Sequence, residues 1–193
     1  IAIAIDEKIL NLESIIKSLG KNNDVIQFTV SPDTDSYSQN IRIIREMENY
    51  ISSNENIESI YVYSKAYGSV LSSKNGLIPL HKFNDVGWIE QFNRLRGGIP
   101  LVIARSPVSI GSPMISLISS IPIRSWDATG ALVINLDEKN LHSNIFRHFS
   151  ANSVQSIIDS DGIILSHPNQ SKIGTNYWNT TNLKGVFSQS LGS

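Results

Sequence analysis

The sequence contains no cysteine among its 193 residues. It therefore forms no disulfide, offers no thiol nucleophile and holds no zinc through thiolates. A dominant charge is also lacking, because sixteen basic and seventeen acidic residues give a net charge of -1. Nucleic-acid binding usually needs a basic surface that neutralises phosphates, and the scattered Lys and Arg residues form no polybasic membrane patch. We therefore predict no nucleic-acid partner for this chain.

Long apolar runs are missing as well. No segment approaches the roughly 18 to 20 apolar residues that span a bilayer. The chain opens with Ile1-Ala2-Ile3-Ala4-Ile5 and turns charged at Asp6. This opening is compatible with the end of a transmembrane helix and also with a short strand. A content of 40% hydrophobic and 17% charged residues is typical of a folded globular protein.

Familiar catalytic and metal-binding patterns are also absent from the sequence. His142 and His148 are six residues apart and cannot form the i, i+4 pair of a zinc site. Asp159-Ser160-Asp161-Gly162 lacks the remaining ligands of a calcium loop and is better interpreted as a hairpin turn. There is no Gly-rich phosphate loop and no Gly-x-Ser-x-Gly elbow. We predict no catalytic residue, no metal and no cofactor, so the protein is not expected to be an enzyme.

The residues that are present predict an α+β fold. Apolar residues at helical spacing predict a helix over 6–19, closed by Gly20, and a second helix with Ile41, Ile44, Met47, Tyr50 and Ile51 on one face. Further helices are expected over 85–95 and 137–149, and another near Asn182. Runs rich in β-branched and aromatic residues predict strands over 57–64, 68–72, 99–105, 113–123, 130–136, 153–159 and 163–166. Because tight turns separate most of them, we expect an antiparallel sheet with helices to one side.

Two stretches of the sequence resemble a known family. Gly130–Asp137, the helix after it, and Val154–His167 followed by Pro168 and Gly174 are similar to double Cache domains. These are the PAS-like extracellular sensor modules of bacterial histidine kinases, chemoreceptors and membrane-bound AraC-type regulators. The resemblance covers about residues 6–177, and its order of motifs is more specific than any single motif.

The resemblance implies a domain organisation and a function. Residues 1–54 would form an N-terminal helical stalk, residues 55–150 a membrane-distal PAS-like unit that binds the ligand, and residues 151–193 a partial membrane-proximal unit. The chain would then be the extracytoplasmic ligand-sensing part of a bacterial transmembrane receptor, anchored in the cell membrane. A homodimer through the stalk stripe of Ile9, Leu12, Ile16 and Leu19 is a further expectation.

Five residues are candidates for contact with a small-molecule ligand in the distal unit. They are Trp88, Arg105, Tyr61, Tyr63 and Ser116. Trp88 would offer a flat apolar face, and Arg105 would grip a carboxylate or another anion. Each has a purely structural alternative: a core tryptophan, a surface arginine at a strand end, or tyrosines that simply pack.

The sequence also departs from the family. The amino-acid-binding subgroup carries Arg-x-Trp-Tyr on the helix that lines the pocket, whereas Val86-Gly87-Trp88-Ile89 keeps only the tryptophan. The sequence therefore names neither the ligand nor the output domain. An alternative function is an extracellular protein-interaction module without a small-molecule pocket, which a fully packed interface between sheet and helix would favour.

Overall fold

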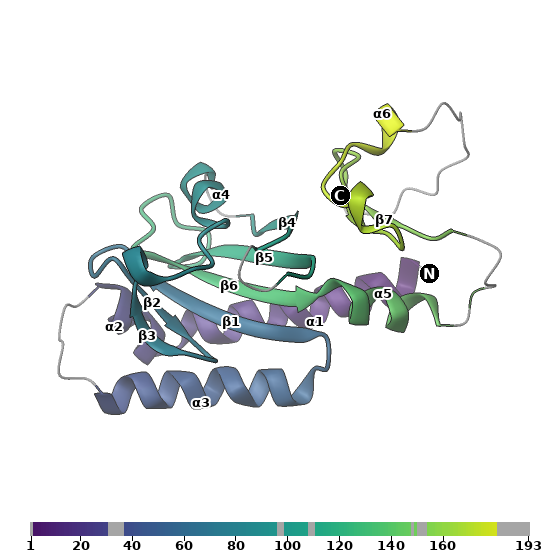
Figure 1. Ribbon diagram of the computed structural model, residues 1–193. Helices are drawn as coiled ribbons and strands as arrows, with labels where there is room; N and C mark the ends of the chain where they lie inside the picture. The colour runs from purple at the N-terminus through teal and green to yellow at the C-terminus, as the bar shows by residue number, and fades with distance from the viewer. Residues whose placement is uncertain are drawn as a thin grey trace.

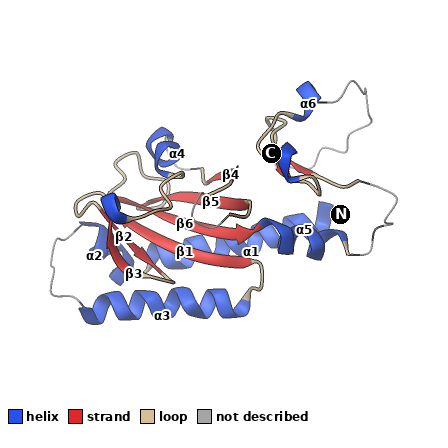
Figure 2. Cartoon of the chain, viewed as in Figure 1, coloured by secondary structure: helices blue, strands red, loops and turns tan. Residues whose placement is uncertain are grey.

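A six-stranded antiparallel sheet forms the centre of the computed structural model (Figures 1 and 2), in the order β3-β2-β1-β6-β5-β4. The structure describes residues 2–30, 37–95, 99–107, 111–147, 149 and 154–180. The strands are β1 (Ile57–Ser64), β2 (Ser69–Ser72), β3 (Gly76–Pro79), β4 (Leu101–Arg105), β5 (Met114–Ile121) and β6 (Gly130–Asp137). The predicted α+β class and antiparallel sheet are confirmed. The short β3 was not predicted.

Three N-terminal helices cover one face of this sheet. They are α1 (Ala2–Lys21), α2 (Asn23–Val30) and α3 (Tyr37–Ser53), and Figure 1 shows α1 and α3 running along the same side of the strands. Their buried residues include Leu19, Val25, Ile43 and Met47, which join the inward side chains of β1, β5 and β6 in one apolar core. Residues 2–5 therefore begin a helix and do not form a strand. Helix α2 was not predicted.

The packing of α1 corrects two expectations. Leu12, Ile16 and Leu19 are buried within the chain's own core, so they pack against the sheet and not, as expected, against a second copy; the side chain of Ile9 lies outside the described residues. Gly20 lies inside α1 and does not cap it. A Cβ atom at Gly20 would come within 2.6 Å of the Ile123 side chain, so glycine here permits close approach of the helix to the turn that follows β5. Division of the chain at residue 54 and dimerisation both stay predictions.

Helix α4 (Ile89–Arg94) covers the opposite face, so the helices do not all lie to one side as predicted. A second apolar cluster lies beneath it, formed by Trp88 and Phe92 with Tyr61, Ile118 and Val133 of the sheet. Before α4, the chain passes through a 3-10 turn, η1 (Leu80–Lys82), and an irregular loop. The predicted helix over 85–95 is therefore shorter at its start, because residues 85–88 form part of this loop.

After β6 the chain enters α5 (Glu138–Phe146), whose first turn is capped by Asp137 accepting from the Asn140 N–H at 2.7 Å. A short hairpin follows, built from β7 (Ile157–Ile158) and β8 (Ile164–Ser166). The predicted Asp-Gly turn is confirmed, since Gly162 has φ of 79° and its N–H donates to the Asp159 carbonyl at 3.1 Å. The last described elements are η2 (Gln170–Lys172) and α6 (Tyr177–Thr180). The helix predicted near Asn182 lies outside the described residues.

A buried carboxylate joins this hairpin to α5. Glu138 accepts hydrogen bonds from the Ser166 hydroxyl at 2.5 Å and from the His167 N–H at 3.1 Å. The Ser166 hydroxyl also lies 2.9 Å from Nδ1 of His142. Burial lowers the pKa of His167, with a further contribution from Lys172. Because Glu138 follows β6 directly, its side chain adds a polar link between sheet and hairpin to the apolar packing of Leu165 in the core.

Replacing Glu138 with alanine is expected to loosen the hairpin, because the Ser166 hydroxyl and the His167 N–H would lose their buried acceptor. The cost of such unpaired groups is about 1–3 kcal/mol. Hydrogen exchange of the amides of residues 157–166 should become faster. Lys139→Ala, at the exposed neighbouring position, should leave this exchange unchanged. Equal exchange in Glu138→Ala and the unaltered protein would contradict this role of Glu138.

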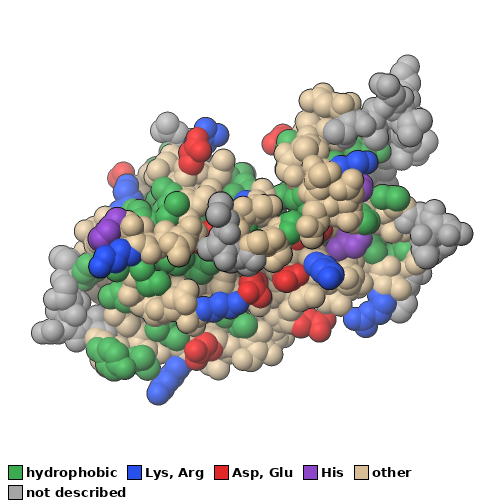
Figure 3. All heavy atoms as spheres, in the orientation of Figure 1, with side chains coloured by type: hydrophobic (Ala, Val, Ile, Leu, Met, Phe, Trp, Pro, Cys, Tyr) green, Lys and Arg blue, Asp and Glu red, His purple; other side chains and the backbone are tan. Residues whose placement is uncertain are grey.

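Basic and acidic side chains are interspersed on the face drawn in Figure 3, without a basic cluster among the described residues. Within the described part of the chain, no helix combines the length and apolar character needed to cross a membrane.

Candidate functional site

A row of polar side chains crosses the centre of the sheet on the face that α4 covers. Ser59 of β1 and Ser116 of β5 both lie opposite Asn135 of β6 in the strand register. Directly opposed residues in antiparallel strands have Cβ atoms about 4.5–5.5 Å apart, which suits short hydrogen bonds. Asn135 Nδ2 donates to the Ser59 hydroxyl at 3.0 Å, and the Ser116 hydroxyl donates to Asn135 Oδ1 at 2.7 Å. The three residues thus form a continuous buried polar row.

Arg105, at the end of β4, extends this row. Its Nε donates to the Ser116 hydroxyl at 2.6 Å, and its Nη2 donates to Asn135 Oδ1 at 2.7 Å. Both terminal nitrogens also donate to the Asp85 carboxylate, with Nη2 at 2.8 Å from Oδ2. The Arg105 side chain is only 9% exposed. A guanidinium held this rigidly is suited to two-point binding of a carboxylate.

Asp85 reaches the row from the loop before α4, and its side chain is only 6% exposed. Besides the contacts to Arg105, Asp85 Oδ2 accepts a hydrogen bond from the Tyr61 hydroxyl at 3.0 Å. Burial raises the pKa of Tyr61 to about 12, and the neighbouring carboxylate of Asp85 adds to the increase. The phenol therefore stays protonated at neutral pH and keeps donating to Asp85.

An aromatic cluster encloses one side of this network. Trp88 is fully buried, and its indole N–H donates to the Asp85 carbonyl at 2.8 Å. The Tyr63 ring packs edge-on against Trp88 and Phe92, with centroid separations of 5.6 and 5.8 Å. Burial raises the pKa of Tyr63. The indole is thus tied both to the loop of Asp85 and to the sheet.

The five predicted residues therefore lie together on one face. Arg105, Tyr61 and Ser116 belong to one hydrogen-bonded network, Trp88 joins it through the Asp85 backbone, and Tyr63 packs beside it. Their role in ligand binding stays a prediction. Ser119, three positions from Ser116, points to the opposite face of β5, and its hydroxyl donates to the neighbouring Ser120 carbonyl at 3.4 Å.

Sequence reasoning missed Asp85, Asn135 and Ser59. For Asn135 a signal existed, because it is the lone polar residue in an otherwise apolar strand (Ala131–Leu136), and its burial demands a polar partner. Asp85 gave no such signal, because it belongs to a loop. In the structure Asp85 pairs with both terminal nitrogens of Arg105, so an anion could reach them only by displacing Asp85.

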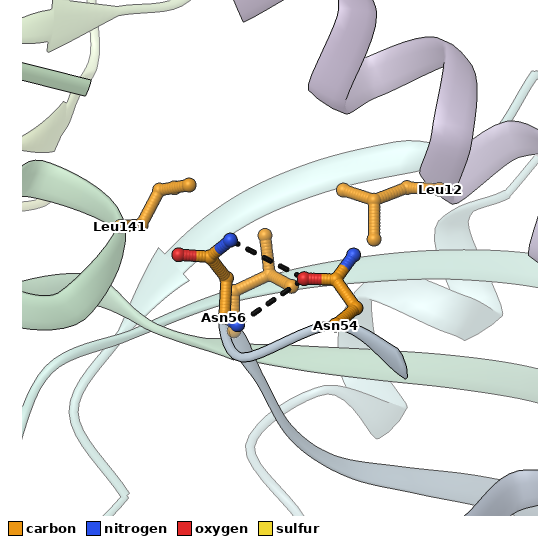
Figure 4. A pocket seen from close by; sticks show the side chains of 5 residues that line it. Leu12, Asn54, Asn56 and Leu141 are labelled. Carbon is orange, nitrogen blue, oxygen red and sulfur yellow. Dashed lines mark hydrogen bonds between the residues drawn. The ribbon is translucent and has the colours of Figure 1, made fainter. Parts of the chain in front are cut away.

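A small pocket on the other sheet face is a poor alternative (Figure 4). Leu12, Asn54, Asn56, Leu136 and Leu141 line it. Its volume is about 10 Å³, which holds one water at most. Asn54 Oδ1 is already engaged, since it accepts from the backbone N–H and the side-chain amide of Asn56, both at 3.2 Å. Among the described residues, no group of three or more metal-ligating side chains gathers to hold an ion.

Comparison with known proteins identifies the fold. No protein-family model and no curated protein matches the sequence. Among solved structures, the chain is similar to the sensory domain of the Campylobacter jejuni chemoreceptor Tlp3, solved with isoleucine bound. The TM-score is 0.58 at 14% identity, over 88% of this chain and 67% of that one.

Two Pseudomonas structures are similar to the same degree. The ligand-binding domain of the P. aeruginosa PAO1 amino-acid chemoreceptor PctC, in complex with GABA, has a TM-score of 0.61 at 14% identity, over 96% of this chain and 79% of that one. The domain of the P. fluorescens chemoreceptor CtaA, with L-valine, has a TM-score of 0.61 at 12% identity, over 93% and 74%. The chain therefore has the fold of chemoreceptor sensory domains, and the resemblance to double Cache sensors is confirmed at this level.

Proposed function

We propose that this chain is the extracytoplasmic ligand-sensing domain of a bacterial transmembrane receptor and binds a small carboxylate-bearing molecule at Arg105. One observation carries the proposal: the buried guanidinium is paired with a carboxylate, Asp85, that belongs to the loop before α4 and not to the sheet. A ligand carboxylate that replaces Asp85 would keep Arg105 paired and move that loop.

A zwitterionic amino compound suits this exchange best. Removing Asp85 from Arg105 without compensation would leave a buried charge unpaired, which is strongly unfavourable. A ligand with both a carboxylate and an ammonium group would pair the first with Arg105 and the second with the released Asp85. The similar sensory domains were solved with isoleucine, valine and GABA, each of which carries both groups.

Two structural connections would transmit the displacement of Asp85 to other parts of the chain. Asp85 is bonded to the Trp88 indole at the start of α4, so its displacement changes the support of that helix. Asn135 lies on β6, which leads through Asp137 into α5 and so to Glu138 and the C-terminal hairpin. A ligand shifts such an equilibrium only by its difference in affinity for the two arrangements. Membrane anchoring and a homodimer would turn this shift into a signal.

The test is a thermal-shift and calorimetric screen with L-isoleucine, L-valine and GABA, each paired with an analogue lacking its carboxylate. A ligand at 100 times its Kd should add about 2.7 kcal/mol of stability. Arg105→Lys should abolish the shift while conserving the charge. Arg94→Lys is the matched control, because Arg94 pairs with Glu90 on the exposed side of α4. Binding that survives Arg105→Lys, or equal binding of the analogues, would contradict the proposal.

A second candidate is a protein-interaction module, and the mutual pairing of the polar groups around Arg105 favours it. With Asp85 in place, four hydrogen bonds hold the guanidinium, and the loop before α4 covers it. The face of the molecule that carries α4 would then be a rigid surface for a protein partner. A broad amino-acid and organic-acid screen without any shift in midpoint would favour this function over the sensor.

A further inference from the structure

A second pocket lies on the α4 face of the sheet, away from Arg105. Its volume is about 160 Å³, more than ten times the roughly 10–15 Å³ that one water molecule needs on the same measure. The side chains that matter for its chemistry are Lys65, Phe92, Leu95, Ser120 and Trp126. It lies between α4, the end of β5 and the connection to β6.

This pocket is separate from the Arg105 network. Ser120 lies four positions beyond Ser116 on β5, a distance of about 13 Å at the usual rise of a strand. The Tyr63 ring packs against Trp88, which is bonded to the Asp85 backbone, and against Phe92, which lines this pocket. A molecule bound here would therefore not touch Arg105 or Asp85.

Ser120 is the first sign of a ligand. The residue is only 4% exposed, and its hydroxyl is buried without a hydrogen-bond partner in the described part of the chain. A buried hydroxyl that has lost water and gained no partner is unfavourable, and such groups are rare in folded proteins. Ser120 faces the same side as Ser116 and lines the pocket, so a polar atom of a bound molecule could supply the missing partner.

The charge and the apolar surface of the pocket narrow the chemistry. No carboxylate of a described residue forms an ion pair with Lys65, whose backbone N–H is bonded to the Thr129 carbonyl. Trp126 is 77% exposed, an unusual state for the largest apolar side chain. Its indole and the side chains of Phe92 and Leu95 offer flat and apolar contact.

From this combination we propose that the pocket formed by Lys65, Ser120, Trp126, Phe92 and Leu95 is a second ligand site, which takes a small aromatic carboxylate. The carboxylate pairs with the Lys65 ammonium and accepts a hydrogen bond from the Ser120 hydroxyl. The ring lies against Trp126 and the α4 side chains. Because α4 lines this pocket and follows the loop of Asp85, occupancy of the second site would favour one position of the helix that the first site also senses.

The experiment uses the whole chain and benzoate as the probe in isothermal titration calorimetry. Benzamide is the control compound without the charge, and acetate is the control compound without the ring. Saturable one-to-one binding of benzoate is expected. Benzamide loses the charge-assisted contact and acetate loses the stacking contact, so each should bind roughly fivefold or more weakly than benzoate.

Variants locate the binding. Lys65→Met, Ser120→Ala and Trp126→Ala should each weaken benzoate binding by roughly fivefold or more, while Lys139→Met, at an exposed position of α5, should leave it unchanged. Ser120→Ala removes only an unpaired hydroxyl, so the variant should remain folded. Absence of saturable binding, or binding unaffected by all three variants, would overturn the proposal. So would loss of benzoate binding in Arg105→Lys, since the compound would then occupy the first site.

Discussion

Replacing Arg105 with methionine is expected to lower the free energy of unfolding by about 3–5 kcal/mol. The methionine fills much of the same volume but leaves the Asp85 carboxylate buried, with only the Tyr61 hydroxyl to donate to it. Ser116 and Asn135 also lose their cationic donor. Urea denaturation followed by circular dichroism measures the change.

Two comparisons make this measurement specific. Arg42 also binds a carboxylate at two points, because its Nε and Nη2 donate to Asp24 at 2.7 and 2.9 Å, but this pair lies on the surface. Arg42→Met should therefore have a far smaller effect, because water replaces the lost partner of an exposed ion. The double variant Asp85→Leu with Arg105→Met removes both charges and should recover most of the stability. A double variant as unstable as Arg105→Met alone would show that the buried charge is not the cause.

Trp88→Ala is expected to cost a similar amount, about 3–5 kcal/mol. The indole is fully buried beneath α4, and its removal leaves a cavity beside Tyr63 and Phe92 as well as an unpaired Asp85 carbonyl. The midpoint of thermal unfolding and the urea midpoint should both fall. This stability effect follows from the burial of Trp88, and a contact between Trp88 and a ligand stays a prediction.

Trp126→Ala is the matched control, because the same side chain is lost from a position that is 77% exposed. Its stability should stay close to that of the unaltered protein. Comparable losses in the two variants would mean that Trp88 is not part of the core. For ligand studies, Trp88→Phe is the more useful variant, since it retains a ring and removes the N–H.

Much of the fold could be predicted from local pattern. Strand β1 was expected over residues 57–64, the limits it has, because its β-branched and aromatic residues dictate extended backbone. The predictions failed where the local signal is weak. Strand β3 has four residues, begins with Gly76 and ends with Pro79, both unfavourable in strands. Helix α2 has only eight residues, too few to be stable alone, and its stability comes from burying Val25 and Phe28.

The site was predictable only in part. Alternation along β1 placed Tyr61 and Tyr63 on one face, and both lie under α4. Arg105 was open to two interpretations, because a residue at the end of a strand can face water or the interior. The side of Arg105 is decided by Asp85, twenty positions earlier, and by Asn135, thirty positions later. No local pattern connects the three.

The sequence by itself determined the class of fold, the antiparallel arrangement and the type of side chain available for an anion. These follow from periodicity and turn chemistry, which act over a few neighbouring residues. Only the tertiary structure decided that Asp85 pairs with Arg105, that Trp88 is fully buried, and that the Ser120 hydroxyl has no hydrogen-bond partner among the described residues. The reason is physical: the cost of a buried charge or hydroxyl depends on which distant groups share its low-dielectric surroundings, and strand register and helix packing bring those groups together.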